Sequence, residues 1–169
     1  MKYKTIGAFK NVQNVPYCKA TTDLMVGMGV LINRAAKTAK LPATEDEAKT
    51  VQYMVTNICD KPDVPLMNTP WKVPSGDHVR ADDLATVDNM EIEFAASEIS
   101  DTYADLAVND TLVFGTDGLL KAVEDVAGYR VYFEVIAKTA YMGSGILAVI
   151  HVQCVVPAPE PDDAESVVT

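Results

Sequence analysis

Cysteine and histidine are scarce in this sequence. Its 169 residues include only two histidines and three widely spaced cysteines, Cys18, Cys59 and Cys154. The sequence has no C-x-x-C pair, and an odd cysteine count excludes a complete disulfide framework. We therefore expect three small buried hydrophobic side chains in a protein that folds in a reducing compartment. One disulfide with a leftover thiol is the alternative.

Recognisable catalytic and ligand-binding motifs are also missing. The sequence has no H-E-x-x-H or G-x-S-x-G element, and Gly27-x-Gly29 lacks the third glycine of a dinucleotide-binding loop. His151 alternates with apolar residues, so we interpret it as a histidine on a sheet surface, and His78 as a residue at a loop edge. A loose calcium site without EF-hand spacing is an alternative for Asp77, Asp82 and Asp83. We predict no catalytic residue, cofactor or metal ligand, and hence no enzyme.

Long hydrophobic runs are absent too. The longest apolar segment, residues 140–156, is interrupted by Ser144, His151 and Gln153 and is too polar for a membrane-spanning helix. The first ten residues contain three lysines and no apolar core, which is not the pattern of a signal peptide. We expect a soluble protein that is made in a cytoplasm and has no membrane partner.

Basic residues are outnumbered by acidic ones. The chain has 14 lysines and arginines against 24 aspartates and glutamates, a net charge of −10. Such a chain repels phosphate backbones, so direct nucleic-acid binding is not expected. The 49% of apolar residues are ordinary for a globular protein, and the length fits one domain with arms.

The charge is unevenly distributed along the chain. Residues 1–40 carry seven basic residues and one acidic residue, whereas residues 41–169 carry seven basic and 23 acidic residues. The two segments therefore have net charges of +6 and −16. This asymmetry suggests a docking polarity in which the basic segment meets an acidic partner. Alternatively, the lysines are solvated residues that protect strand edges.

Strand patterns dominate the residues that follow the first 20. Runs of alternating, β-branched or aromatic residues predict strands at residues 24–32, 51–58, 78–80, 90–94, 111–114, 119–123, 129–136 and 146–156. Glu91 and Glu93 are expected on the wet face of their strand. A capping box at Thr44 and Glu47 predicts a helix of one or two turns, and residues 97–110 have room for another short helical turn.

The fold class follows from these patterns. Thr116-Asp117-Gly118 predicts a hairpin turn, and the short connections around it favour an antiparallel meander. We predict a mainly β protein, an antiparallel β-barrel or sandwich of about six to eight strands. Residues 1–20 are expected to form an extended N-terminal arm, residues 21–156 a single β-rich domain, and residues 157–169 an acidic, proline-rich tail.

Candidate partner-binding residues lie in the arm and in a proline-rich connection at residues 60–74. Aromatic residues in irregular segments are common interface anchors, although they can also fill the protein's own core. The predicted set combines such aromatics with the lysines of the arm: Lys2, Tyr3, Lys4, Phe9, Lys10, Tyr17 and Trp71. We expect a chain without residues 1–17 to fold but to bind its partner more weakly.

Four stretches of the chain resemble the small capsid-decoration (cementing, head-stabilising) proteins of tailed bacteriophages. These are the lysine-bearing lead MKYKTIGAFKNVQNVPYCKATTDL, the segment GMGVLINRAAKTAKLPATEDEA, the element VPSGDHVRADDL, and VNDTLVFGTDGLLKAV with the following YRVYFEVIAKT. The third is similar to a recurrent I-x-x-G-x-x-V-R element, and the last to a G-D-x-L-x-V-x-x-D-G-x-L hairpin. Asn109-Asp110 stands where that hairpin often has Gly-Asp.

The resemblance implies a non-enzymatic virion protein on the outer surface of a capsid. It would bridge and stabilise subunits of the major capsid protein, as a homo-oligomer that in such proteins is often a trimer. A tail-tube or other virion subunit is the alternative, because such proteins share much of the pattern. A small soluble β-barrel enzyme with a site built from scattered acidic residues is a further alternative.

Overall fold

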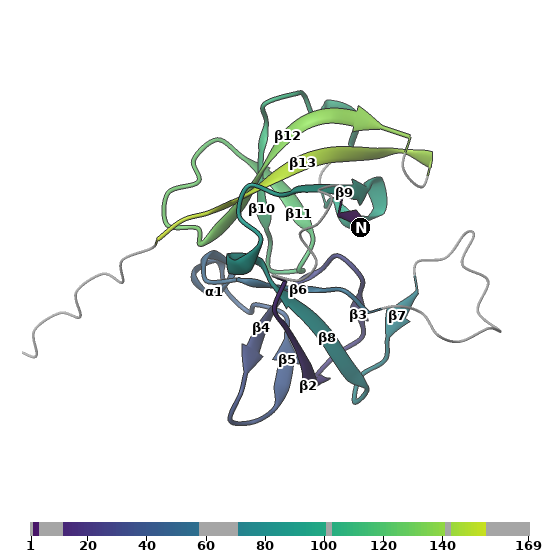
Figure 1. Cartoon of the computed structure of the whole chain (residues 1–169), viewed down its shortest axis with the longest axis vertical. Coiled ribbons are helices and arrows are strands. Elements are labelled where there is room, and N and C mark those ends of the chain that lie inside the picture. The colour runs from purple at the N-terminus through teal and green to yellow at the C-terminus, as the bar shows by residue number, and fades with distance from the viewer. Residues whose placement is uncertain (1, 4–11, 58–70, 101–102, 141–142, 155–169) are drawn as a thin grey trace, which may run out of the picture.

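A closed five-stranded barrel and a six-stranded sheet lie one above the other in the computed structural model (Figure 1). The structure describes residues 2–3, 12–57, 71–100, 103–140 and 143–154. The predicted fold class, mainly β with a barrel and short helical turns, is confirmed. The predicted tail, residues 157–169, lies outside the described residues.

The barrel is built from five short strands. They are β2 (Asn14–Ala20), β4 (Gly29–Asn33), β5 (Thr38–Lys40), β6 (Tyr53–Val55) and β8 (His78–Asp83). Neighbouring strands are antiparallel except β2 and β5, whose parallel pairing of Lys19 with Thr38 closes the barrel. Small apolar side chains suit so narrow an interior. The barrel core accordingly contains Val15, Cys18, Ala20, Val30, Ala39, Val55, Val79 and Ala81.

The boundary predicted for the N-terminal arm is wrong, because Asn14–Ala20 is a full strand of this barrel. Pro16 disfavours a helix but not this strand. It lies where the register between β2 and β8 shifts, between Val15 and Cys18. A proline, which has no N–H to donate, is tolerated at such an irregularity. Residues 4–11 of the predicted arm lie outside the described residues.

The second part of the molecule is a sheet in the order β1-β9-β13-β12-β10-β11. Its strands are β1 (Lys2–Tyr3), β9 (Glu91–Ala95), β10 (Thr111–Phe114), β11 (Leu120–Val123), β12 (Val131–Thr139) and β13 (Gly145–Val152). A separate two-stranded sheet joins β3 (Leu24–Met25) and β7 (Lys72–Val73).

The predicted antiparallel meander is only partly correct. The hairpins β10–β11 and β12–β13 form, but β12 pairs with β10 rather than with β11. A hydrogen bond anchors the connection between the two hairpins: the Arg130 amide donates to the carbonyl of Lys49 over 2.8 Å. Lys49 ends helix α1 (Glu45–Lys49), so a contact distant in sequence anchors the residue that precedes β12.

Helix α1 begins as predicted. The Thr44 hydroxyl accepts the amide of Glu47 at 3.2 Å, and the Glu47 carboxylate accepts the amide of Ala43 at 2.7 Å. Three 3₁₀ turns, Leu84–Thr86, Ala96–Glu98 and Tyr103–Asp105, complete the helical content of the described residues.

The larger hydrophobic core lies between the sheet and the barrel. Phe133 packs edge-on against both Phe94 and Phe114, with ring centroids 5.2 and 5.3 Å apart. Met54 of β6 and Leu84, next to β8, are fully buried members of the same cluster. Because residues in and beside the barrel strands supply part of the sheet's core, the two β structures stabilise one another.

Three local expectations differ from the structure. The expected strand at residues 24–32 is divided into β3 and β4 by a turn in which Gly27 has a φ of +94°. Glu93 is buried rather than solvated, since Leu147 of β13 and Lys2 of β1 flank it in the sheet register. Cys18 is buried as expected, whereas Cys154 is exposed; both are free thiols, and Cys59 lies outside the described residues.

Candidate docking surface

The structure places the predicted partner-binding residues in different surroundings. Tyr17 of β2 is an exposed large side chain, 40% accessible. Trp71 is half-buried and packs against the barrel core, which corresponds to the core-filling alternative. Lys2 and Tyr3 form the edge strand β1 beside β9. Three predicted residues lie outside the described part of the chain: Lys4, Phe9 and Lys10.

Arg34 joins Tyr17 to a second tyrosine. One terminal guanidinium nitrogen donates to the Tyr17 hydroxyl and the other to the Tyr53 hydroxyl, each over 3.1 Å. Arg34 follows β4, whereas the tyrosines come from β2 and β6, so the contact connects three separate parts of the barrel wall. These two hydrogen bonds raise the pKa of the Arg34 guanidinium further above its usual value, that of Tyr53 contributing most.

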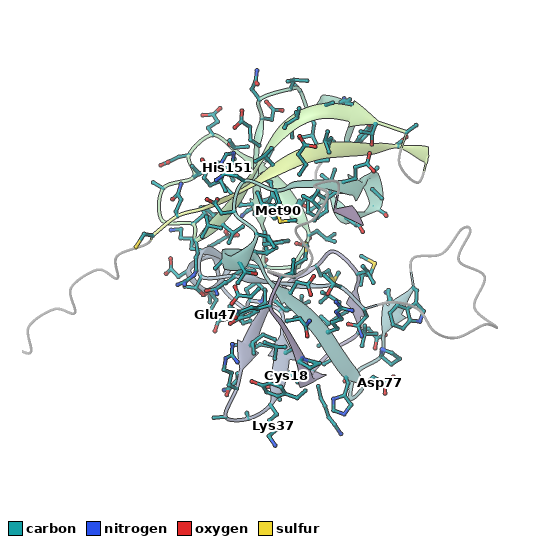
Figure 2. The ribbon with its side chains drawn as sticks, viewed as in Figure 1. Cys18, Lys37, Glu47, Asp77, Met90 and His151 are labelled. Carbon is teal, nitrogen blue, oxygen red and sulfur yellow. The ribbon has the colours of Figure 1, made fainter. Side chains whose placement is uncertain are left out.

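The turn between β4 and β5 sets the position of Arg34. The Asn33 side-chain carbonyl accepts the amide of Ala36 at 2.9 Å, an Asx-type contact that folds the chain back. Lys37 closes the turn with a φ of +54°, and its carbonyl accepts the amide of Lys19 at 2.9 Å. Lys19 and Lys37 are therefore neighbours at the end of the barrel away from the sheet, where Figure 2 shows Lys37. We call Tyr17, Lys19, Arg34, Lys37 and Tyr53 the Arg34 cluster.

The basic residues of this cluster carry uncompensated charge. Elsewhere on the barrel, Lys40 pairs with Glu47 at 2.8 Å, and Arg80 lies 3.8 Å from Asp82. Within the described residues no carboxylate forms an ion pair with Lys19, Arg34 or Lys37, and all three side chains are exposed. The Arg34 cluster is thus an exposed positive surface that contains two tyrosines.

The barrel and the sheet differ in net charge. Described residues 12–57 and 71–83, which contain the barrel, carry seven basic and seven acidic residues. The described residues from 84 onwards, which contain most of the sheet, carry three basic and ten acidic residues, a net charge of −7. The charge asymmetry along the sequence therefore becomes an asymmetry in space, with the acidic end opposite the Arg34 cluster.

The histidines and aspartates considered in the sequence do not gather into one site. The His151 ring stacks on Tyr132, 4.8 Å between centroids, and its Nε2 lies 3.3 Å from a Glu134 oxygen without hydrogen-bond geometry. Asp82 is buried and accepts the Thr56 hydroxyl at 2.9 Å, whereas Asp77 is exposed. No group of three metal-ligating side chains occurs within the described residues.

No protein-family model matches the sequence, and no curated protein matches it. Among the described helices, none has the length and apolarity needed to cross a membrane.

Sequence reasoning found only part of the Arg34 cluster. The sequence predicts Tyr17 as a partner-binding residue and places Lys19, Arg34 and Lys37 only in a basic segment. It places Tyr53 in a strand and not on a docking surface. The hydrogen bonds of Arg34 with both tyrosines depend on closure of the barrel, and no local sequence motif predicts that closure.

Proposed function

We propose that this protein is a virion structural protein of a tailed bacteriophage. In this proposal it binds the outer surface of the capsid, and bridges and stabilises neighbouring subunits of the major capsid protein. The observation that carries the proposal is the Arg34 cluster, an exposed surface in which a guanidinium is held between two tyrosine hydroxyls. The sequence resemblance to capsid-decoration proteins supplies the identity of the partner.

The composition of the Arg34 cluster suits protein–protein contact. Tyrosine and arginine are enriched in interfaces and among the residues that dominate binding energy, because they combine a large contact area with directional hydrogen bonds. Lys19 and Lys37 add positive charge that acts over several ångströms. A surface of this kind can hold a protein on an acidic shell with one defined face inward.

The charge asymmetry supplies an orientation. If the Arg34 cluster faces the capsid, the part of the molecule from residue 84 onwards, whose described residues carry a net charge of −7, faces solvent. Complementary charge at one end and repulsion at the other disfavour the inverted arrangement. Many copies on one shell each need only modest affinity, because a contact that bridges two subunits gains from effective concentration.

Co-sedimentation with undecorated heads of the protein's own phage tests this function. The protein should pellet with the heads at low salt and should be released as the salt concentration rises, because exposed charges are screened. Recovery in the supernatant at every salt concentration contradicts the proposal. Self-assembly into rings or tubes without heads would instead indicate a tail-tube subunit.

A further inference from the structure

We propose that Arg34 is the carboxylate receptor of the docking surface, and that its partner presents an aspartate or glutamate side chain to it. This inference rests on the proposed function, because it names the chemistry by which the capsid protein would be recognised. Tyr17 and Tyr53 are positioning residues, which hold the guanidinium in a binding-ready orientation.

The guanidinium retains unused donors. Arginine has five N–H groups in a planar fork, and Arg34 uses two of them on Tyr17 and Tyr53. The other three have no hydrogen-bond partner within the described residues. An arginine fork matches the two oxygens of a carboxylate, and such charge-assisted pairs are stronger than neutral hydrogen bonds. An incoming carboxylate would therefore find a suitable set of donors.

The tyrosines prepare this site in two ways. They come from separate strands, and their two contacts restrict the long Arg34 side chain before the partner arrives. Binding therefore costs less of its conformational entropy. Each hydroxyl accepts a hydrogen bond from Arg34 and keeps its own hydrogen available for donation. A carboxylate close to Arg34 can accept from these hydroxyls as well.

The charge of the whole chain favours a protein carboxylate over a nucleic-acid phosphate. Arginine binds both groups, but a nucleic acid brings a continuous line of negative charge. To bind such a line of charge, the Arg34 cluster offers only Lys19 and Lys37 in addition to Arg34, and the whole chain has a net charge of −10. A local acidic patch on a protein can contact the Arg34 cluster and remain distant from the acidic sheet.

A set of single substitutions tests the receptor on intact heads. R34K keeps the positive charge but removes the fork, so we expect about a tenfold loss of affinity for undecorated heads. R130K makes the same change at an exposed arginine next to the sheet and should leave the affinity unchanged. Because Arg34 is exposed, thermal melts of both variants should match that of the wild type.

The positioning role has a separate readout. Y53F retains the ring and its packing but loses the hydroxyl, so it should weaken head binding without lowering the melting temperature. In the R34K background, Y53F should have no further effect on binding, because there is no fork left to position. Additive losses would show that Tyr53 contributes independently of Arg34 and would overturn its positioning role.

Competition separates the candidate partners. Poly-L-glutamate should displace the wild-type protein from heads more effectively than a DNA oligonucleotide of equal total charge, and R34K should reduce this difference. If the wild type binds heads and R34K binds equally well, the carboxylate receptor is wrong while the proposed function stands. Preferential displacement by DNA would indicate phosphate recognition and also overturn the inference. No binding of the wild type to heads would overturn the proposed function itself.

Discussion

Gly29 of barrel strand β4 lies directly against the aromatic ring of Phe114 in sheet strand β10. A Cβ atom built on Gly29 would come within 2.6 and 2.7 Å of the two Cδ atoms of that ring. The Gly29 amide also donates to the carbonyl of Gly118, 2.8 Å away. The barrel and the sheet therefore meet at a point where no side chain fits, which fixes how closely they pack.

The substitution G29A should destabilise the whole protein. Overpacking of a filled core costs about 1–3 kcal/mol and occasionally more, and Phe114 is fully buried. We expect G29A to lower the free energy of unfolding by about 3 kcal/mol, measured by urea denaturation. G76A is the comparison, because Gly76 has a φ of +88° but no atom within 4 Å of its added Cβ. It should cost only about 1–2 kcal/mol of backbone strain, and equal effects would contradict the account.

Glu98 should make stability depend on pH. Its carboxyl group is buried, and this loss of solvation raises its pKa above the usual value, although the Ala95 amide donates to it over 2.7 Å. Between the usual value of about 4.3 and the raised one, the folded state holds the proton that the unfolded state has lost. The free energy of unfolding must then fall as the pH rises through this window.

The variant E98Q isolates this effect. An amide has no proton to lose, so the decline in unfolding free energy above about pH 4.3 should become shallower than in the wild type. The measurement is urea denaturation over a pH series, and E124Q, at an exposed glutamate, is the matched control. Parallel curves for wild type and E98Q would show that Glu98 does not carry the dependence.

The cap of helix α1 is a second local test. The Thr44 hydroxyl accepts the Glu47 amide, so T44A should lower the free energy of unfolding by about 1 kcal/mol. T44S keeps the hydroxyl and should retain most of that stability in thermal melts. Because the carbonyl of Lys49, which ends this helix, binds the Arg130 amide, a larger loss would indicate that fraying of α1 also loosens β12.

Two truncations distinguish residues 1–11, called the lead below, from the barrel strand β2 that follows them. Deleting residues 1–17 removes buried Val15 and its pairing with Ala81, so this chain should lose its cooperative thermal transition, contrary to the expectation from sequence. Deleting residues 1–11 leaves β2 intact and should preserve the transition in circular dichroism. Only the shorter deletion can therefore test whether the lead contributes to head binding. A cooperative, wild-type-like melt of the longer deletion would contradict the assignment of β2 to the barrel.

Signals that lie within a few residues of one another predicted the fold well. The Thr44 cap, the turn around Gly118 and the alternation along β12 and β13 all appear where the sequence indicates them. Each depends on local hydrogen bonds or on side-chain periodicity, so one segment contains the whole signal.

Relationships between distant segments could not be predicted in this way. The inclusion of Asn14–Ala20 in the barrel depends on its partners β5 and β8, and the burial of Glu93 depends on the flanking strands β1 and β13. The contact of Arg34 with Tyr17 and Tyr53 likewise exists only after the barrel has closed. Residue patterns identify strands, but the order of strands decides which surface side chains meet.

Electron microscopy of undecorated phage heads mixed with the purified protein tests the central proposal most directly. The account predicts regular added density on the outer shell, with the barrel and its Arg34 cluster facing the capsid and the acidic sheet facing solvent. Bare heads, with the protein present as free particles, rings or tubes, would contradict the decoration function. Regular density with the sheet facing inward would retain that function but contradict the docking surface.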